Sequence, residues 1–320
     1  MSKGLVTIFG GSGFIGKYVV RALVRDGWRV RVAMRRPHTG LDLKVIGNVG
    51  QVQLVQANLR FPLSVERAVE GSDAVVNLVA LLFESGKQNF EALHVKGAQT
   101  LAAACAKAGI KNLVHISALG ADINSDSDYA RTKGEGEALI RGDIPSADIL
   151  HPSIVFGPED NFFNQFAAMT SFAPALPLIG GGATKFQPIF AGDVAEAVAA
   201  CLKKGTQGET YGLGGPQTYS FKELLEFVLT TVDRKRLLVP VPWFAANMMG
   251  FAGEVSGALP FVAPFLTRDQ VKLLKSDNVV PEDMKSAKDL GISLETIEAI
   301  VPSYLARYRH HGQFHERQAN

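Results

Sequence analysis

The sequence has few cysteines and no excess of charge of either sign. Cys105 and Cys201 are the only two cysteines among 320 residues, and they do not form a Cys-x-x-Cys pair. This excludes a disulfide framework and indicates a reducing compartment. Both stand in alanine-rich helical patterns, so we expect small buried hydrophobic residues. The 33 lysines and arginines against 31 aspartates and glutamates leave a formal net charge of +2, which favours no nucleic-acid partner.

The sequence also lacks a targeting segment, internal repeats and low-complexity tracts. Residues 1–4 precede an apolar stretch without the pattern of a secretory signal or the arginine- and serine-rich composition of a transit peptide. We expect a bacterial cytoplasmic start or a chain that has already been processed. With 47% hydrophobic and 20% charged residues and a mean hydropathy of +0.10, the chain is expected to be globular.

Short apolar stretches alternate with amphipathic helical patterns in the first half of the chain. Strands are expected at 5–9, 28–34, 52–57, 74–78, 113–117 and 147–156, and helices at 14–25, 88–108 and 128–141. This alternation predicts an α/β fold with a Rossmann-type, doubly wound parallel sheet covered by helices on both faces. We assign residues 1–157 to this nucleotide-binding domain, with parts of 185–215 completing its sheet. Residues 158–320 are expected to form a smaller mixed C-terminal lobe.

The segment 237–266 is strongly apolar and carries one charged residue, Glu254. Its largest apolar side chains are those of Trp243, Phe244, Met248, Met249, Phe251, Phe261 and Phe265. A membrane-spanning helix needs about 20 continuous apolar residues, and Pro260, Pro264 and Glu254 interrupt this stretch. Two interpretations stay open: a buried helix and loop of the small lobe, or an apolar surface that docks on a membrane or a partner.

Three histidines near the C-terminus, His310, His311 and His315, resemble a metal-binding cluster only superficially. They stand in a terminal segment that offers no shell of carboxylates. We therefore expect no metal site.

A glycine-rich turn stands between the first expected strand and the first expected helix. Residues 10–16 read GGSGFIG, which gives G-x-G-x-x-G from Gly11 and G-x-x-G-x-x-G from Gly10. Glycines permit a sharp turn and a close backbone approach to a pyrophosphate, which meets the positive end of the helix. This context predicts a dinucleotide site. The residues expected at the nucleotide are Gly10, Ser12, Gly13, Phe14, Ile15 and Gly16.

The end of the second expected strand lacks an acidic residue. NAD-binding proteins usually place Asp or Glu there to hold the ribose 2′-hydroxyl, whereas residues 30–36 read VRVAMRR. Arg35 and Arg36 can instead form charge-assisted hydrogen bonds to a 2′-phosphate. We therefore predict NADP(H) as the cofactor. Arg35 is the stronger candidate, because Arg36 can equally be a solvated strand end.

Tyr129 and Lys133 form a Tyr-x-x-x-Lys pattern in the helix that follows the fifth expected strand, and Ser117 closes that strand. Residues four apart share one helix face, so a lysine ammonium there can lower the pKa of the phenol from about 10. Tyr129 would then exchange a proton with a substrate oxygen that Ser117 holds. The alternative is that the pair only binds the nicotinamide ribose.

Together these motifs resemble the extended and atypical short-chain dehydrogenases/reductases, the family of sugar-nucleotide epimerases and related reductases, over residues 4–230. Further stretches that carry the similarity are NLVA at 77–80, HPSIVFGP at 151–158 and FAGDVA at 190–195. The resemblance implies that Ser117, Tyr129 and Lys133 are catalytic, or vestigially so, and also belong to the cofactor site. It implies further cofactor contacts at Asn58, Leu59, Val79, Ala80 and Pro152.

A narrower resemblance is to the nucleotide-binding accessory subunits of respiratory complex I and their bacterial relatives. The stretches GGSGFIGKYVVRAL, VRVAMRRP, HISALGAD and YARTKGEGE carry it. It implies a tightly held NADP(H) that stabilises fold and assembly instead of transferring electrons. It also implies peripheral-arm subunits of complex I as partners, and a position at the membrane surface on the cytoplasmic or matrix side. The apolar segment 237–266 suits such a position.

Three residues depart from the family pattern. Asn58 stands where many relatives carry Asp beside the adenine, His94 where extended relatives usually carry Asn, and His151 where Arg is common. In these relatives the asparagine often supports the chain of waters in the active site, so His94 puts such a proton relay in doubt. His94 is either a new acid/base group or a packed helix histidine. Three functions stay open: a structural NADP(H)-holding subunit of complex I, an NADP-dependent reductase or epimerase of a small carbonyl or hydroxyl substrate, and a sensor of the NADPH/NADP ratio.

Overall fold

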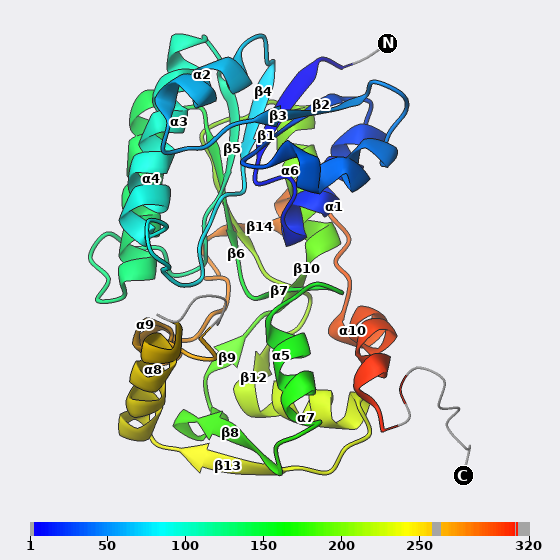
Figure 1. The fold of residues 1–320 in the computed structure, drawn as a ribbon, viewed down its shortest axis with the longest axis vertical. Coiled ribbons are helices and arrows are strands. Elements are labelled where there is room, and N and C mark those ends of the chain that lie inside the picture. The colour runs from blue at the N-terminus through cyan, green and yellow to red at the C-terminus, as the bar shows by residue number, and fades with distance from the viewer. Residues whose placement is uncertain (1–2, 258–263, 311, 313–320) are drawn as a thin grey trace. The chain divides into compact units, whose positions relative to one another are not determined.

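The computed structural model describes residues 3–257, 264–310 and 312 of the chain (Figure 1). Residues 258–263 of the apolar segment, and the histidines at 311 and 315, lie outside this described part. Within it, no helix is both long enough and apolar enough to cross a membrane.

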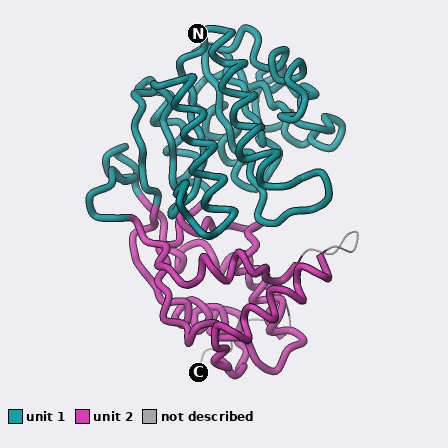
Figure 2. Tube along the Cα trace, turned by 90° about the vertical axis from the view of Figure 1, so that its left-hand side faces the viewer, with its two compact units in different colours: residues 1–152, 191–213, 281–293 teal, residues 153–190, 214–280, 294–320 magenta. Residues whose placement is uncertain are grey.

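The chain divides into two compact units, coloured separately in Figure 2. Unit 1 comprises residues 1–152, 191–213 and 281–293, and unit 2 comprises residues 153–190, 214–280 and 294–320. Each unit is therefore assembled from three separate stretches of the chain.

Unit 1 is built on one eight-stranded sheet. Its strands are β1 (Leu5–Phe9), β2 (Arg29–Met34), β3 (Val52–Gln56), β4 (Ala74–Asn77), β5 (Asn112–Ile116), β6 (Asp148–Pro152), β11 (Thr210–Leu213) and β14 (Lys285–Ser286). All pairings in it are parallel, in the order β14-β11-β6-β5-β4-β1-β2-β3. β1 and β4 pair with Val6 opposite Ala74, and both strands are almost wholly buried, as a sheet covered on both faces requires.

Helices cover both faces of this sheet. They are α1 (Phe14–Arg25), α2 (Pro62–Val69), α3 (Lys96–Lys107), α4 (Asp128–Asp143) and α6 (Ala191–Lys204). α1 packs beside α6, whereas α2, α3 and α4 pack side by side, and Figure 1 shows these two groups on opposite sides of the sheet. α1 buries Val19, Val20 and Leu23 along one stripe. The predicted α/β class with a Rossmann-type parallel sheet is confirmed.

The strand order reverses at β1, which lies between β2 and β4. From β1 the chain continues to β2 and β3 on one side, and then returns to build β4, β5 and β6 on the other. Open parallel sheets bind ligands at the carboxyl ends of the strands beside such a reversal. The topology therefore puts a candidate site at the ends of β1 and β4.

Three elements differ from the sequence prediction. The helix expected from residue 88 begins with a π-helical turn, η2 (Glu91–Val95), which precedes α3. The strand expected at 147–156 ends at Pro152, because proline cannot donate to a ladder, and resumes as β7 (Val155–Phe156). β14 joins the edge of the unit 1 sheet, whereas the prediction placed its residues in the C-terminal lobe. The sequence did not reveal this strand, because two residues are too few to show an alternation pattern.

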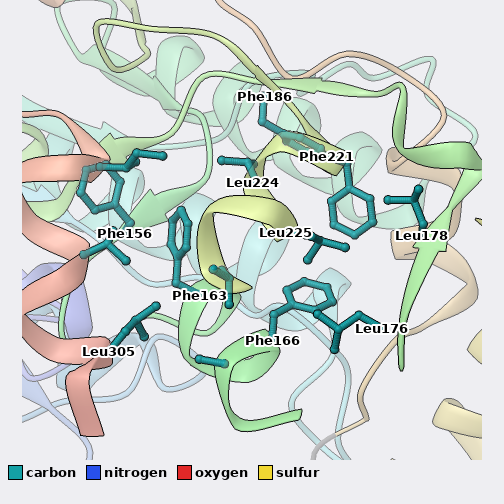
Figure 3. Close-up of a cluster of buried hydrophobic side chains, with 14 of the residues drawn as sticks. Phe156, Phe163, Phe166, Leu176, Leu178, Phe186, Phe221, Leu224, Leu225 and Leu305 are labelled. Atoms are coloured by element: carbon teal, nitrogen blue, oxygen red, sulfur yellow. The ribbon is translucent and has the colours of Figure 1, made fainter. Parts of the chain in front are cut away.

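Unit 2 contains short strand pairs and five α-helices in its described part. The strands are β7, β8 (Ala175–Ile179), β9 (Lys185–Phe186), β10 (Ile189–Phe190), β12 (Tyr219–Ser220) and β13 (Leu237–Val241), and the helices are α5 (Phe162–Met169), α7 (Phe221–Thr231), α8 (Trp243–Gly257), α9 (Arg268–Leu273) and α10 (Ile297–Leu305). Its core is rich in phenylalanine (Figure 3). Phe163 of α5 meets Phe156 nearly edge to face, with ring centroids 6.0 Å apart, a favourable aromatic geometry.

Candidate nucleotide-binding site

The residues predicted to hold a nucleotide follow the carboxyl ends of neighbouring strands in unit 1. Gly10 follows β1, Arg35 follows β2, Asn58 comes after β3, Val79 comes after β4 and Ser117 follows β5. Pro152 is the last residue of β6. Because all these strands are parallel, their ends meet at one edge of the sheet. The tertiary structure thus places residues from six separate segments along a single edge.

The glycine-rich turn after β1 is closed so tightly that side chains are excluded from two of its positions. Gly10 has φ +83°, and a Cβ there would lie 3.1 Å from the carbonyl carbon of Leu78. A Cβ on Gly16 would run into the carbonyl oxygen of Gly10 and come within 2.6 Å of the Cα of Gly11. The turn therefore needs glycine at both positions to bring α1 against the ends of β1 and β4.

The N-terminus of α1 is open to an anion. Gly13 is its N-cap, is exposed, and provides no side-chain cap, and the first turn carries no acidic residue. The first N–H groups of a helix have no intrahelical partner, and the helix dipole favours negative charge there. Ser12, Phe14 and Ile15 are half-buried around this point. The turn and the uncapped helix fit the pyrophosphate of a dinucleotide.

Arg35 and Arg36 are exposed at the end of β2. The Arg35 guanidinium donates a hydrogen bond of 2.5 Å to the side-chain oxygen of Gln88. Within the described part of the chain, neither arginine forms an ion pair with a carboxylate. Both charges are therefore available to an anionic group such as a ribose 2′-phosphate.

The other predicted cofactor contacts offer mainly backbone and apolar surface. The Asn58 side-chain oxygen accepts a hydrogen bond of 3.1 Å from the Arg60 N–H, which forms a turn after β3. The Leu59 side chain is buried in the core of unit 1, so only the backbone of Leu59 could contact a ligand. Val79 is half-buried, Ala80 is exposed and Pro152 is buried.

Lys133 is the most deeply buried charged group of the candidate site. Its side chain is on α4, the residue is 2% exposed, and its ammonium donates a hydrogen bond of 3.0 Å to the carbonyl oxygen of Ile116. Burial lowers the pKa of Lys133 to about 8, and the Glu137 carboxylate opposes this fall. The ammonium therefore loses its proton at a lower pH than an exposed lysine does.

Tyr129 differs from the sequence expectation in its pKa. Its ring meets those of Phe90 and His94 nearly edge-on, with centroid distances of 5.8 and 5.5 Å. Burial raises the pKa of Tyr129 to about 12, where the sequence analysis expected a lysine to lower it. Desolvation disfavours the charged phenolate, and no contribution from the Lys133 charge offsets it. The phenol is protonated at neutral pH in this arrangement.

Glu137 is the residue of this site that the sequence analysis missed. The Ser117 hydroxyl donates a hydrogen bond to Glu137 Oε1. The same carboxylate oxygen lies 2.9 Å from His151 Nε2, close enough for an ion pair, although this nitrogen makes no well-aligned hydrogen bond. The signal was present in the sequence, because Glu137 follows Lys133 by four residues and so shares its helix face.

His94 is a packed, neutral histidine. Its Nε2 accepts a hydrogen bond of 3.0 Å from the Leu81 N–H, so the proton is assigned to Nδ1, which lies 3.1 Å from the Thr132 hydroxyl. Burial, and secondarily the charge of Lys133, lowers the pKa of His94 to about 3. Of the two interpretations left open for His94, the structure supports the packed helix histidine.

His115 is a second buried neutral histidine beside the candidate site. Its Nδ1 lies 3.1 Å from the Asn77 side-chain nitrogen, which makes a hydrogen bond between β5 and β4. Burial, and then the charge of Lys133, holds the pKa of His115 well below its usual value. Unit 1 thus contains two imidazoles that stay uncharged in the folded state.

Comparison with known proteins agrees with this geometry. A family model described as the NAD dependent epimerase/dehydratase family matches residues 6–214. The chain is 31% identical over 309 residues to the mitochondrial NADH-ubiquinone oxidoreductase 40 kDa subunit of Neurospora crassa, covering 96% of this chain and 80% of that protein. It is 32% identical over 312 residues to NADH dehydrogenase (ubiquinone) 1 alpha subcomplex subunit 9, mitochondrial, of Mus musculus, covering 97% and 81%.

Among solved structures, UDP-glucose 4-epimerase from Thermotoga maritima superposes with a TM-score of 0.69 at 15% identity, covering 94% of this chain and 97% of that chain. At this identity the likeness concerns the fold alone. The family model, in contrast, spans more than half of the chain, and the two relatives match it nearly from end to end. The chain therefore belongs to the NAD dependent epimerase/dehydratase family.

Proposed function

We propose that this chain is an NADP(H)-binding accessory subunit of respiratory complex I, in which the nucleotide is mainly structural. The observation that carries the proposal is the extent of the similarity to the two NADH-ubiquinone oxidoreductase subunits, which covers 96 and 97% of the chain. The family model ends at residue 214. Similarity to these subunits therefore continues through the later part of the chain, beyond the part that the wider family shares.

The residues of unit 1 support NADP(H) as the nucleotide. The glycine turn and the uncapped N-terminus of α1 suit a pyrophosphate, and Arg35 and Arg36 suit a 2′-phosphate. Lys133 and Tyr129 would face the nicotinamide ribose, as the family resemblance implies. A nucleotide bound here stabilises the folded state by about 4 kcal/mol when its free concentration exceeds the dissociation constant a thousandfold.

The state of the acid–base groups supports a structural role. The Ser117 hydroxyl already donates its proton to Glu137, so it cannot donate it to a substrate oxygen at the same time. The pKa of Tyr129 lies at about 12, far from the value near neutrality that suits a general acid or base. This arrangement can hold a nucleotide without preparing it for hydride transfer.

Helix α8 of unit 2 supports attachment to other surfaces. Phe244, Met248, Phe251 and Val255 follow one another at helical spacing, and between 55 and 70% of each residue is exposed. The Arg268 guanidinium lies 5.3 Å from the centre of the Phe251 ring and is paired with the Glu254 carboxylate at 2.8 Å, so this pair adds no net charge to the face. Peripheral-arm subunits of complex I and the membrane surface would be the partners of the 237–266 segment. The site of attachment would be the cytoplasmic face of a bacterial inner membrane, or the matrix side in mitochondria.

Native-gel fractionation of gently solubilised membranes, with mass spectrometry locating the chain, tests this proposal. We expect the chain to migrate with the complex I subunits and to retain NADP(H) that carbonyl substrates do not oxidise. Removing the nucleotide should lower the melting temperature and weaken the association. A chain found only as a small soluble species would contradict the proposal.

A second candidate function is an NADP-dependent reductase or epimerase of a small carbonyl or hydroxyl substrate. It is favoured by the placement of Tyr129 and Lys133 four residues apart on α4, beside Ser117 at the end of β5. Incubation of the NADPH-loaded protein with a broad panel of carbonyl compounds, followed at the absorbance of NADPH, separates the two functions. Turnover with any of them would replace the structural role by an enzymatic one.

A further inference from the structure

We propose that Glu137 is a positioning residue of the nucleotide site, whose carboxylate supplies the counter-charge for the buried Lys133 ammonium and ties Ser117 and His151 to α4. The inference rests on the proposed nucleotide site and is independent of any assembly with complex I. It concerns unit 1 alone.

The geometry of α4 puts Glu137 in the right place for this role. Tyr129, Lys133 and Glu137 follow one another at intervals of four residues, and therefore lie along one face of the helix. The Glu137 side chain is 16% exposed. One of its oxygens accepts from the Ser117 hydroxyl after β5 and lies 2.9 Å from His151 Nε2 in β6. A single carboxylate oxygen thus connects the helix with the ends of two strands.

The electrostatics of Lys133 require a counter-charge. A buried ammonium is costly unless an opposite charge or several hydrogen bonds compensate for its lost hydration. The titratable groups around Lys133 are Tyr129 and Glu137 on α4, His94 on η2, His115 on β5 and His151 on β6. Glu137 is the one carboxylate in this set. It contacts Ser117 and His151 and forms no direct ion pair with Lys133 in the described part of the chain, so it opposes the fall in the pKa of Lys133 through space.

The two nearest imidazoles cannot take the place of Glu137. His94 and His115 are neutral in the folded state, because burial and the charge of Lys133 lower their pKa values. His151 can only add positive charge. Removing the negative charge of Glu137 would therefore leave Lys133 with its hydrogen bond to the Ile116 carbonyl but with no opposite charge among these groups, and the lysine would lose its proton at a lower pH.

The consequence for the nucleotide is a pH-dependent affinity. With the nucleotide bound at the proposed site, a charged Lys133 would donate to the ribose hydroxyls, and a neutral one would attract them less. We expect the affinity of the wild-type chain for NADPH to decline as the pH rises through about 8, where Lys133 loses its proton. In Glu137→Gln, which keeps the shape and an acceptor oxygen but removes the charge, this decline should move to lower pH by about one unit.

Two readouts on the full chain test the inference. The first is the titration of the Lys133 side chain in nucleotide-free protein, followed by NMR of ¹³C-labelled lysine and assigned with Lys133→Arg. The second is NADPH affinity, measured by fluorescence from about pH 6 to 9. The matched control is Glu135→Gln, the same substitution on the same helix, where Glu135 pairs with Arg131 at 2.6 Å. The control should keep both wild-type midpoints.

The outcomes separate this inference from the proposed function. If Glu137→Gln keeps the wild-type Lys133 midpoint, the inference is overturned, even when NADPH binds normally. If the Lys133 midpoint moves down but the wild-type chain binds no NADPH, the charge pairing holds and the proposed nucleotide site fails. A shift of similar size in Ser117→Ala, which keeps the carboxylate, would show that the hydrogen-bonded scaffold acts instead of the charge, and would also overturn the inference.

A milder variant covers the case in which Glu137→Gln does not fold. Glu137→Asp withdraws the carboxylate by one methylene group and keeps its charge. We expect it to move the Lys133 midpoint in the same direction by a smaller amount. An unchanged midpoint in Glu137→Asp, in a protein with a wild-type circular dichroism spectrum, would count against Glu137 as the counter-charge.

Discussion

The Tyr304 hydroxyl of α10 donates a hydrogen bond of 2.5 Å to the carboxylate of Asp160, which stands just before α5 in unit 2. Asp160 is 3% exposed. Burial raises the pKa of Asp160, and the bond from Tyr304 opposes that rise. This bond joins residues that are 144 positions apart in the sequence, and it closes the C-terminal helix of the described chain onto the phenylalanine-rich core.

Tyr304→Phe should therefore destabilise unit 2. The substitution leaves the buried carboxylate with the N–H groups of Gly157 and Asn164, and removes its hydroxyl donor. We expect the free energy of unfolding to fall by about 1–3 kcal/mol, measured by urea denaturation. Tyr308→Phe is the control, because the hydroxyl of half-buried Tyr308 makes only a 3.3 Å bond to Asn164. Equal losses in both variants would contradict the role given to Asp160.

Gly16→Ala should abolish nucleotide binding. The added methyl group would collide with the carbonyl oxygen of Gly10, so the turn must open and α1 must shift away from the sheet. We expect the thermal shift caused by NADPH to disappear. Gly142→Ala is the matched control, because beyond the adjacent backbone of α4 no atom lies within 4 Å of the added methyl group. It should stabilise the helix by about 0.5–1 kcal/mol and keep the thermal shift.

Arg35→Ala should reduce the preference for NADPH over NADH. At the proposed site, Arg35 would donate a charge-assisted hydrogen bond to the 2′-phosphate, a group that NADH lacks. We expect NADPH affinity to fall about ten- to a hundredfold, with little change for NADH, as measured by calorimetry. Arg29→Ala removes another exposed arginine, at the opposite end of β2, and serves as the control. Parallel losses for both nucleotides would argue against a 2′-phosphate contact at Arg35.

His94→Asn should make the fold less sensitive to acid. The pKa of His94 falls from 6.5 to about 3 on folding, so the unfolded chain binds an extra proton between these values. The contribution of neutral His94 to the free energy of unfolding is complete above pH 6.5 and is lost as the pH falls towards 3. Between these values the free energy of unfolding falls by about 1.4 kcal/mol per pH unit. The variant should lose that part of the slope and keep the part due to His115. Urea denaturation at several pH values measures the slope, and an unchanged slope would refute this account.

Met248→Glu should weaken attachment of the chain to membranes or complex I. Met248 lies in the middle of the exposed apolar face of α8, and a charge there must be desolvated on docking. We expect the chain to move from the complex I band to the soluble fraction in native gels, with an unchanged melting temperature. Phe172→Glu, at an exposed apolar residue outside 237–266, should leave the migration as in wild type. The same migration for wild type and Met248→Glu would exclude α8 as the docking face.

Much of the unit 1 sheet was predictable because its elements are locally determined. The apolar stretch 5–9 and the helix 14–25 have the predicted bounds, since a short buried strand and an amphipathic helix each leave their own periodicity. β14 and the π-turn η2 were not predicted. A strand of two residues has no periodicity, and a π-turn depends on how its side chains pack rather than on their spacing.

The sequence by itself determined the local parts of the candidate site. The glycines at 10–16 dictate a tight turn, and the absence of an acid at the end of β2 leaves two arginines there. These features depend on residue type and on neighbours a few positions away, so they can be inferred from the order of residues alone.

Only the tertiary structure decided the protonation states and the partners within the site. Burial moved the pKa of Tyr129 upward, against the expectation from the Tyr-x-x-x-Lys spacing, and made His94 a neutral packing residue. The bond between Ser117 and Glu137 joins the end of β5 to the middle of α4. Desolvation and long-range contacts depend on which segments fold against one another, and a one-dimensional pattern does not contain that information.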